Sequence, residues 1–229
     1  MKKFLFLISL FMAFVTVSAQ SVADSVRREV VFETTSGSFR VMLYNDTPLH
    51  RYQMLRLVAE GYYDGLLFHR VIPNFMIQAG DSASRHAQPG VLLGDSREPY
   101  AIPAEIRFPV HCHKRGALAA ARESDQVNPE RKSSYSQFYI VIGSVFSDPV
   151  LDKVQERIDK ATGGQVKLTP EVREIYRTQG GTPHLDGQYT VYGEVVEGME
   201  VVEQIQWADR DENNRPLQDV RILKARIVK

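Results

Sequence analysis

The apolar residues of this chain fall mostly into short runs separated by turn residues, a pattern typical of β-strands joined by loops. A hairpin is predicted where the runs 29–34 and 39–44 flank Thr35-Ser36-Gly37-Ser38. Pro73-Asn74 separates two further runs, which are expected to form two strands or one bent strand. These two runs and the other predicted strands cover 66–72, 75–79, 117–121, 134–142, 188–196 and 220–228.

Two segments between the predicted strands have helical spacing of their apolar residues. The first begins at Thr47-Pro48, an N-cap followed by proline at the first helical position, and ends before Gly61. We therefore expect a helix over 48–60, and a second one over 199–206. The residues expected on the buried face of the first helix are Tyr52, Leu55 and Ala59, with Met54 and Val58 beside them.

Many short strands and few helices favour an antiparallel sandwich or barrel over alternating strand-helix units. The segment 145–180 departs from this pattern, because its apolar residues recur at helical spacing on both sides of Gly163-Gly164. We interpret it as a helical insertion in a single domain over 29–229. If the strands close into a barrel of about eight, side chains fill its interior, and a peptide would bind on the outer wall.

The N-terminus has the layout of a secretory signal peptide. Lys2 and Lys3 precede an apolar run over 4–17, and Val17-Ser18-Ala19 supplies a small-residue cleavage pattern. A membrane span is the weaker interpretation, because the run is shorter than the ~20 apolar residues that cross a bilayer. We expect a signal peptide over 1–19, a linker over 20–28, and an exported protein, periplasmic or secreted, with no stable membrane anchor after cleavage.

Charge and cysteine content narrow the function classes. The chain has 28 Lys and Arg against 28 Asp and Glu, without the basic excess that phosphate-backbone binding requires, so nucleic acid is not an expected partner. Cys112 is the only cysteine, has no disulfide partner within the chain and is expected to be a small buried apolar side chain. His111-Cys112-His113 has the spacing of a metal-site fragment, but no second cluster completes a tetrahedral set, and no metal is predicted.

Two repeats of Gly-Asp-Ser, at 80–82 and 94–96, are similar to the nucleophile block of one esterase family. That family also carries an Asp-x-x-His element near its C-terminus, which is absent here because His184 is the last histidine. We therefore expect turns at both repeats and rank a serine esterase third among the candidate functions.

Three blocks carry the most specific signal. They are Phe68-His69-Arg70-Val71-Ile72-Pro73-Asn74-Phe75-Met76-Ile77-Gln78-Ala79-Gly80-Asp81, then Ser136-Gln137-Phe138-Tyr139-Ile140, then Leu185-Asp186-Gly187-Gln188-Tyr189-Thr190-Val191-Tyr192-Gly193-Glu194-Val195. Their content and order closely resemble the cyclophilin family. The resemblance implies a mainly β fold, a closed eight-stranded antiparallel barrel with two packing helices, and peptidyl-prolyl cis/trans isomerase activity on proline-containing polypeptides, without a cofactor.

The resemblance also implies the site. Its catalytic residues would be Arg70, Phe75 and Gln78, and its substrate-binding residues Met76, Ala121, Gln137, Tyr139, His184, Leu185 and Tyr189. Four positions depart from the best-known eukaryotic pattern, in which Tyr139 is usually phenylalanine, His184 often tryptophan, Tyr189 often histidine and Arg122 often asparagine. These departures affect the rim of the site, and with it substrate preference and inhibitor binding.

Strand geometry supports part of this assignment independently. Alternate residues of a strand share a face, so Gln137 and Tyr139 should point away from Phe138 and Ile140. The same rule puts Phe75 opposite Met76 and Gln78, so their membership of one site rests on the resemblance and on a bend near Pro73. A function of another class remains open, namely a cyclophilin-fold module that binds proline-containing segments with little turnover.

Overall fold

One curled antiparallel sheet of eight strands forms the body of the protein. The computed structural model describes residues 26–228, so the predicted signal peptide and most of the predicted linker lie outside the described residues. The strands are β1 Arg28–Thr34, β2 Gly37–Leu43, β3 Phe68–Ile72, β4 Met76–Ala79, β5 Ala117–Ala120, β6 Phe138–Val141, β7 Val191–Glu197 and β8 Ile222–Ile227, in the order β3-β4-β6-β5-β7-β2-β1-β8. The mainly β prediction with eight antiparallel strands is confirmed.

The prediction of a closed barrel is wrong in its closure, because β3 and β8 are the two edges of the sheet. The two edges meet only where these strands begin: the amide of Phe68 donates to the carbonyl of Val220 at 2.9 Å, the amide of Ile222 donates to the carbonyl of Leu66 at 2.8 Å, and Leu67 forms a bridge with Arg221. Further along β3, the amide of Val71 donates instead to the carbonyl of Asn214 in the loop before β8, at 2.8 Å. The sheet is therefore an open half-barrel whose two edge strands are joined by backbone hydrogen bonds at one end only.

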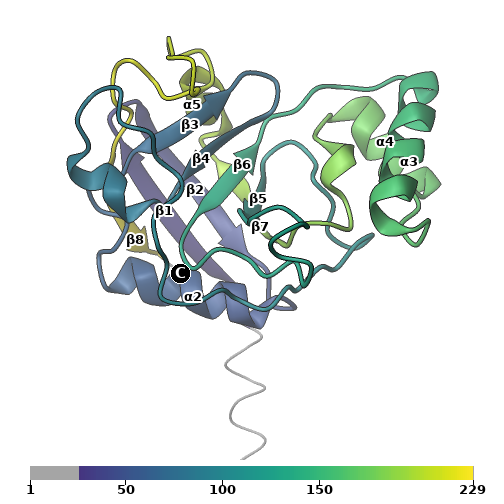
Figure 1. Ribbon diagram of the computed structural model, residues 1–229, viewed down its shortest axis with the longest axis horizontal. Coiled ribbons are helices and arrows are strands. Elements are labelled where there is room, and N and C mark those ends of the chain that lie inside the picture. Colours follow the sequence, from purple (N-terminus) through teal and green to yellow (C-terminus); the bar gives the residue numbers. More distant parts are fainter. Residues whose placement is uncertain (1–25, 229) are drawn as a thin grey trace, which may run out of the picture.

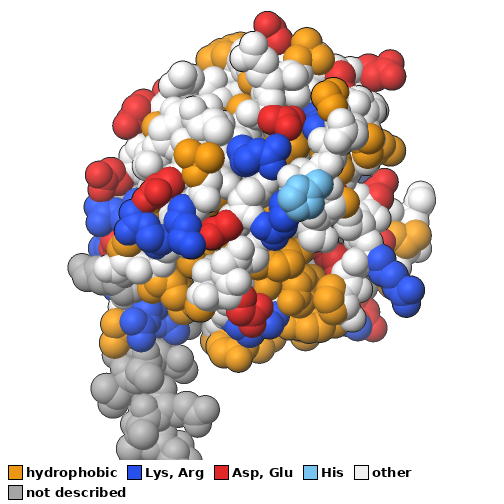
Figure 2. All heavy atoms as spheres, turned by 90° about the vertical axis from the view of Figure 1, so that its left-hand side faces the viewer, with side chains coloured by type: hydrophobic (Ala, Val, Ile, Leu, Met, Phe, Trp, Pro, Cys, Tyr) orange, Lys and Arg blue, Asp and Glu red, His pale blue; other side chains and the backbone are white. Residues whose placement is uncertain are grey.

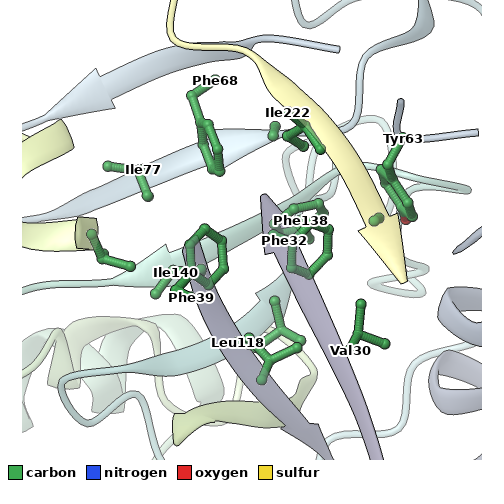
Figure 3. Close-up of a cluster of buried hydrophobic side chains, with 14 of the residues drawn as sticks. Val30, Phe32, Phe39, Tyr63, Phe68, Ile77, Leu118, Phe138, Ile140 and Ile222 are labelled. Atoms are coloured by element: carbon green, nitrogen blue, oxygen red, sulfur yellow. The ribbon is translucent and has the colours of Figure 1, made fainter. Parts of the chain in front are cut away.

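Aromatic and branched side chains fill the inner face of the half-barrel (Figure 3). Phe32 of β1 lies 5.3 Å, centroid to centroid, from both Phe39 and Phe138, and Phe68 meets Phe138 edge-on at 6.4 Å. All four rings are fully buried. Because the interior is filled by its own side chains, a ligand has room only outside it.

Helices α2 (Pro48–Ala59) and α5 (Met199–Ile205) lie at opposite ends of the half-barrel (Figure 1). Their positions match the two predicted helices. The predicted buried face of α2 is right for Met54 and Val58, which are buried, and for Leu55, which is partly buried against the inner core. It is wrong for Tyr52, which is 68% exposed, and for Ala59, which is exposed. The reason is that α2 also buries polar side chains with specific partners, which apolar spacing does not reveal.

Within residues 26–228, the remaining helices are two short 3₁₀ turns and a pair beside the sheet. The 3₁₀ turns are η1 (Ser82–His86) and η2 (Pro183–Leu185). Helices α3 (Asp148–Thr162) and α4 (Pro170–Thr178) lie in the segment 145–180, hereafter the insertion, and stand to one side of the half-barrel in Figure 1. In the described part of the chain, no helix is long and apolar enough to cross a membrane.

The insertion has its own small hydrophobic core, which confirms that Cys112 is a buried apolar residue. That core consists of Leu151, Ile158, Leu168, Val172 and Tyr176 from the insertion together with Cys112 from the loop before β5. The two ends of the insertion are held together, because Ser144 and Gly181 exchange backbone hydrogen bonds. The insertion is thus fastened at its base and packed against the β5 loop.

Candidate active site

The outer face of the central strands carries a second hydrophobic cluster, separate from the inner core. In β6, Phe138 and Ile140 point into the inner core, while Tyr139 and Val141 belong to the outer cluster. The predicted alternation along this strand is therefore confirmed. Strand β4 pairs with β6 so that Gln78 lies opposite Tyr139, which sets polar and aromatic groups side by side on the outer wall.

A cavity of about 980 Å³ opens on this outer wall. Every predicted site residue lines it except His184: Arg70, Phe75, Met76, Gln78, Ala121, Gln137, Tyr139, Leu185 and Tyr189. His184, which belongs to η2, instead stacks on Phe75, with ring centroids 5.6 Å apart. The three sequence blocks, which are far apart along the chain, therefore meet at one site.

The bend after Pro73 explains how Phe75 joins the residues that strand alternation would place opposite it. Asn74 takes a left-handed conformation with φ of 56°, and the amide of Phe75 closes the turn on the carbonyl of Ile72 at 3.1 Å. Phe75 therefore precedes β4 rather than belonging to it. With Met76, Tyr139 and Leu185, it forms the apolar pocket of the cavity.

A row of hydrogen bonds runs along one side of the apolar pocket. Nη1 of Arg70 donates to Oε1 of Gln78 at 3.3 Å, and Nε2 of Gln78 donates to Oε1 of Gln137 at 3.0 Å. Nε2 of Gln137 then donates to the carbonyl of Gly94 at 2.8 Å. Because a guanidinium can only donate, it fixes which way each amide in the row points. The row orients Arg70 toward the cavity.

The guanidinium of Arg70 keeps donors free for a ligand. Within residues 26–228, no carboxylate pairs with it, and it makes a single hydrogen bond, to Gln78. Its half-buried position lowers its pKa from the ordinary value, with Tyr189 acting in the opposite direction. Burial that costs hydration without an ion pair in return makes Arg70 a strong donor to an oxygen or nitrogen placed in the cavity.

The rim residue Arg122 supports the ring of Tyr189 instead of facing the cavity freely. Its guanidinium carbon lies 4.3 Å from the centroid of that ring, a cation-π contact. Arg122 also donates through Nε to the carbonyl of Gln188 at 2.9 Å and pairs with Asp125 at 2.6 Å. Arg122 and Tyr189 both depart from the best-known eukaryotic cyclophilin pattern, and in the structure they contact each other.

Loops before β5 and β6 form the other half of the cavity. Most of their lining residues were not predicted, because they lack the periodicity that marks strands and helices. Asp81 anchors the first loop by accepting hydrogen bonds from the amide of Gly94 and the hydroxyl of Ser96. The two Gly-Asp-Ser repeats are thus hydrogen-bonded to each other. Asp81 is also the N-cap of η1, because its side chain accepts from the amide of Ala83.

The residues His111, Cys112 and His113 point to three different surroundings. His111 stacks on Tyr44 and bonds the carboxylate of Asp46, while Cys112 lies in the core of the insertion. His113 is fully buried and hydrogen-bonded on both ring nitrogens. Among residues 26–228, no group of three or more His, Cys, Asp and Glu is arranged to hold a metal ion.

Sequence comparison gives independent information on this site. The sequence model of the family described as cyclophilin type peptidyl-prolyl cis-trans isomerase/CLD matches residues 29–227. A peptidyl-prolyl cis-trans isomerase-like 1 of Emericella nidulans is 29% identical over 201 residues, which cover 87% of this chain and 94% of the relative. The isomerase CYP18-2 of Arabidopsis thaliana is 27% identical, with 87% and 93% covered.

Solved structures show the same fold. A cyclophilin type peptidyl-prolyl cis-trans isomerase of Cryptosporidium parvum superposes with a TM-score of 0.61 at 21% identity, covering 89% of this chain and 99% of its own. A second structure of that protein, obtained in the presence of the dipeptide Ala-Pro, superposes with a TM-score of 0.59 at 22% identity, with 88% and 99% covered.

Proposed function

The chain belongs to the cyclophilin-type peptidyl-prolyl cis-trans isomerase family and has the isomerase activity of that family, and from this premise we propose that it acts on exported proteins with Arg70 as the catalytic donor. The proposed reaction is rotation about X-Pro bonds, without a covalent intermediate. The free donors of Arg70 beside the apolar pocket are the observation that carries the proposal.

The chemistry follows from the amide bond. Its resonance gives a rotation barrier of roughly 18–20 kcal/mol, and twisting the bond breaks that resonance. The proline nitrogen then gains a localised lone pair, which accepts a hydrogen bond far better than the planar nitrogen does. A donor that meets this lone pair stabilises the twisted state more than the ground state, which is the condition for catalysis.

Each part of the site has a role in this scheme. The apolar pocket of Phe75, Met76, Tyr139 and Leu185 holds the proline ring by burial. Gln78 holds the guanidinium of Arg70 at the pocket edge, and Gln137 fixes Gln78 in turn. The Cryptosporidium relative studied with Ala-Pro supports a proline-containing peptide as the ligand. No bond is formed or broken, so the scheme needs no nucleophile, metal or redox group.

Exported clients are proposed from the N-terminal sequence, whose Lys2-Lys3, apolar run and Val17-Ser18-Ala19 have the layout of a signal peptide. A chain with such a leader meets proteins that fold after translocation, where slow X-Pro isomerisation limits folding.

The test is cis-to-trans exchange in a short X-Pro peptide with the purified protein lacking residues 1–19. Uncatalysed exchange takes roughly 10–100 s at 25 °C, so catalysis is directly visible. Acceleration that is lost in Arg70→Ala is the expected result. Peptide binding without acceleration would overturn the enzyme proposal in favour of a binding module.

A further inference from the structure

A buried polar network connects the insertion to the apolar pocket. The hydroxyl of Tyr176 in α4 donates to Oδ2 of Asp186 at 2.6 Å, and Oδ1 of Asp186 lies 2.9 Å from Nδ1 of His113. On its other side, Nε2 of His113 lies 3.0 Å from the hydroxyl of Tyr139. Tyr176 and Asp186 are 0% exposed, His113 1% and Tyr139 5%.

The chemistry of these groups fixes the direction of each hydrogen bond. The Asp186 carboxylate can only accept, and Oδ1 also accepts from the amide of His113 at 2.9 Å. Nδ1 of His113 must therefore carry a proton, and in the tautomer whose single ring proton is on Nδ1, Nε2 is an acceptor. The hydroxyl of Tyr139 then donates to Nε2. In this arrangement each of the four side chains has a hydrogen-bond partner within the network.

The network supplies a hydrogen-bond acceptor to the buried hydroxyl of Tyr139. Its ring is one wall of the apolar pocket, and its hydroxyl is buried, so this hydroxyl needs an acceptor that water does not supply. His113 is that acceptor, and it lies nearly parallel to Tyr139 with an interplanar angle of 13°. The hydroxyl therefore also fixes where the ring stands. A phenylalanine at this position would need no acceptor, and no hydrogen bond would fix the position of its ring.

The insertion is attached to the same network by backbone contacts. Gly181, at its end, bridges both Ser144 and Lys114, and the amide of Thr182 donates to the carbonyl of His113 at 2.8 Å. These bonds hold the start of α3, the end of α4 and the segment of His113 as one unit. A displacement of α4 therefore reaches His113 through Asp186 and through the backbone.

We propose that the insertion is a positioning element of the active site, in which Tyr176, through Asp186 and His113, holds the Tyr139 wall of the apolar pocket in place. This inference rests on the proposed function, because it takes the apolar pocket as the proline site. The apolar pocket binds the proline ring equally in the planar and the twisted state of the peptide bond. The network therefore affects the affinity for substrate, and Arg70 lowers the barrier of the chemical step. Tyr176 is thus a positioning residue.

The test is a double-mutant cycle between Tyr176→Phe and Tyr139→Phe, measured as kcat and KM on an X-Pro peptide. Tyr176→Phe should raise KM about two- to twelve-fold, the equivalent of one buried hydrogen bond, with kcat within about two-fold. In the Tyr139→Phe background the same change should leave KM unaltered, because the hydroxyl that needs the network is gone. A general loss of stability would raise KM equally in both backgrounds, which would overturn the proposal.

Two further measurements keep the outcome clear. Thr162→Val removes a hydrogen bond from Thr162 to the carbonyl of Ile158 within the insertion but outside the network, and it should leave KM unchanged in both backgrounds. If Tyr176→Phe does not fold, Asp186→Asn breaks the next link of the same cycle with little change in volume, and the same pattern is expected. An inactive wild type would overturn the proposed function, whereas an active wild type with an unchanged KM in Tyr176→Phe would overturn only this inference.

Discussion

Arg70 and Gln78 face each other across two paired strands, with the guanidinium donating to the amide oxygen at 3.3 Å. Arg70→Ala should lower kcat/KM by about two to three orders of magnitude, the scale for losing one transition-state donor. The half-barrel should stay folded, because no salt bridge in residues 26–228 involves Arg70. Peptide exchange with circular dichroism as the folding control checks this. Arg70→Lys keeps the positive charge but lacks the planar guanidinium with its fixed donor geometry, so it should recover only part of the rate.

His184 stacks on Phe75 where related cyclophilins often carry tryptophan. The imidazole offers less apolar surface than an indole and no indole donor at that position, so cyclosporin should inhibit weakly. His184→Trp should tighten inhibition, measured as the concentration that halves peptide exchange. Tight inhibition of the wild type would show that the rim is aligned wrongly with the family.

His69 makes stability depend on pH. The ring is buried, neither nitrogen has a hydrogen-bond partner in the described part of the chain, and burial lowers the pKa of His69 to about 4, partly opposed by Asp81. An unfolded histidine binds its proton near pH 6.5, so the unfolded state gains protons first as the pH falls. The free energy of unfolding should therefore decrease between pH 6.5 and pH 4, by about 3 kcal/mol from this residue.

Urea denaturation of wild type and His69→Gln at several pH values measures this dependence. The variant should show a shallower decrease over the same interval, whatever its stability at pH 7. Burial also lowers the pKa of His184 to about 4, so part of the decrease should persist in the variant. His86 is exposed, and His86→Gln should have the slope of the wild type. Equal slopes for wild type and His69→Gln would contradict the assignment.

Glu105 caps α2 from a distant loop. Its carboxylate accepts from the amides of Leu49 and His50 at 3.1 and 3.0 Å and contacts Nδ1 of His50 at 2.7 Å. Burial alone would raise the pKa of Glu105, but these hydrogen bonds outweigh it and the pKa lies below its usual value. Glu105→Gln should destabilise the fold by about 2 kcal/mol at pH 7.

This stabilisation is present above the unfolded pKa and is lost as the pH falls through the lowered folded value. The stability difference between wild type and Glu105→Gln should therefore shrink below pH 4. Glu60→Gln is the matched control, because Glu60 forms an exposed pair with Arg56 and should cost less than about 0.5 kcal/mol. A difference that does not change with pH would contradict an ionised cap.

The N-terminal prediction concerns residues outside the described part of the chain. Cleavage after Ala19 should leave Gln20 as the first residue of the exported protein. Intact-mass analysis of the protein exported by an expression host checks this. Recovery of Met1 in the membrane fraction would contradict both the cleavage and the proposed exported clients.

The fold was predictable where the signal is local. Strand runs, Thr47-Pro48 and the helical spacing of the insertion all report on neighbours within a few residues, and these elements are present. Closure of the barrel was not predictable, because it depends on whether β3 and β8 meet, which no local pattern encodes. The buried face of α2 was predictable only in part for a similar reason, since the burial of Gln53 depends on its hydrogen bond to the carbonyl of Tyr135, which is distant along the chain.

The site was predictable from resemblance and only partly from physics. Alternation correctly placed Gln137 and Tyr139 on one wall, but the turn at Asn74 was needed to bring Phe75 to it. The sequence around His113 suggests only a metal-site fragment, because its real partners, Asp186 and Tyr139, are distant along the chain. A buried polar group whose partners come from two distant segments leaves no periodic trace in a sequence.

The open half-barrel bears on how the protein behaves at high concentration. A sheet edge is a template for strand addition by a second chain, and two edges per molecule would permit linear aggregates. Here the β3 edge is covered by Asn214, and β8 turns Lys224 and Arg226 outward. Side chains of both charges lie on the face shown in Figure 2, and the formal net charge of the whole chain is zero. Long-range repulsion between molecules is therefore weak, and protection against strand addition depends on these features of the two edges.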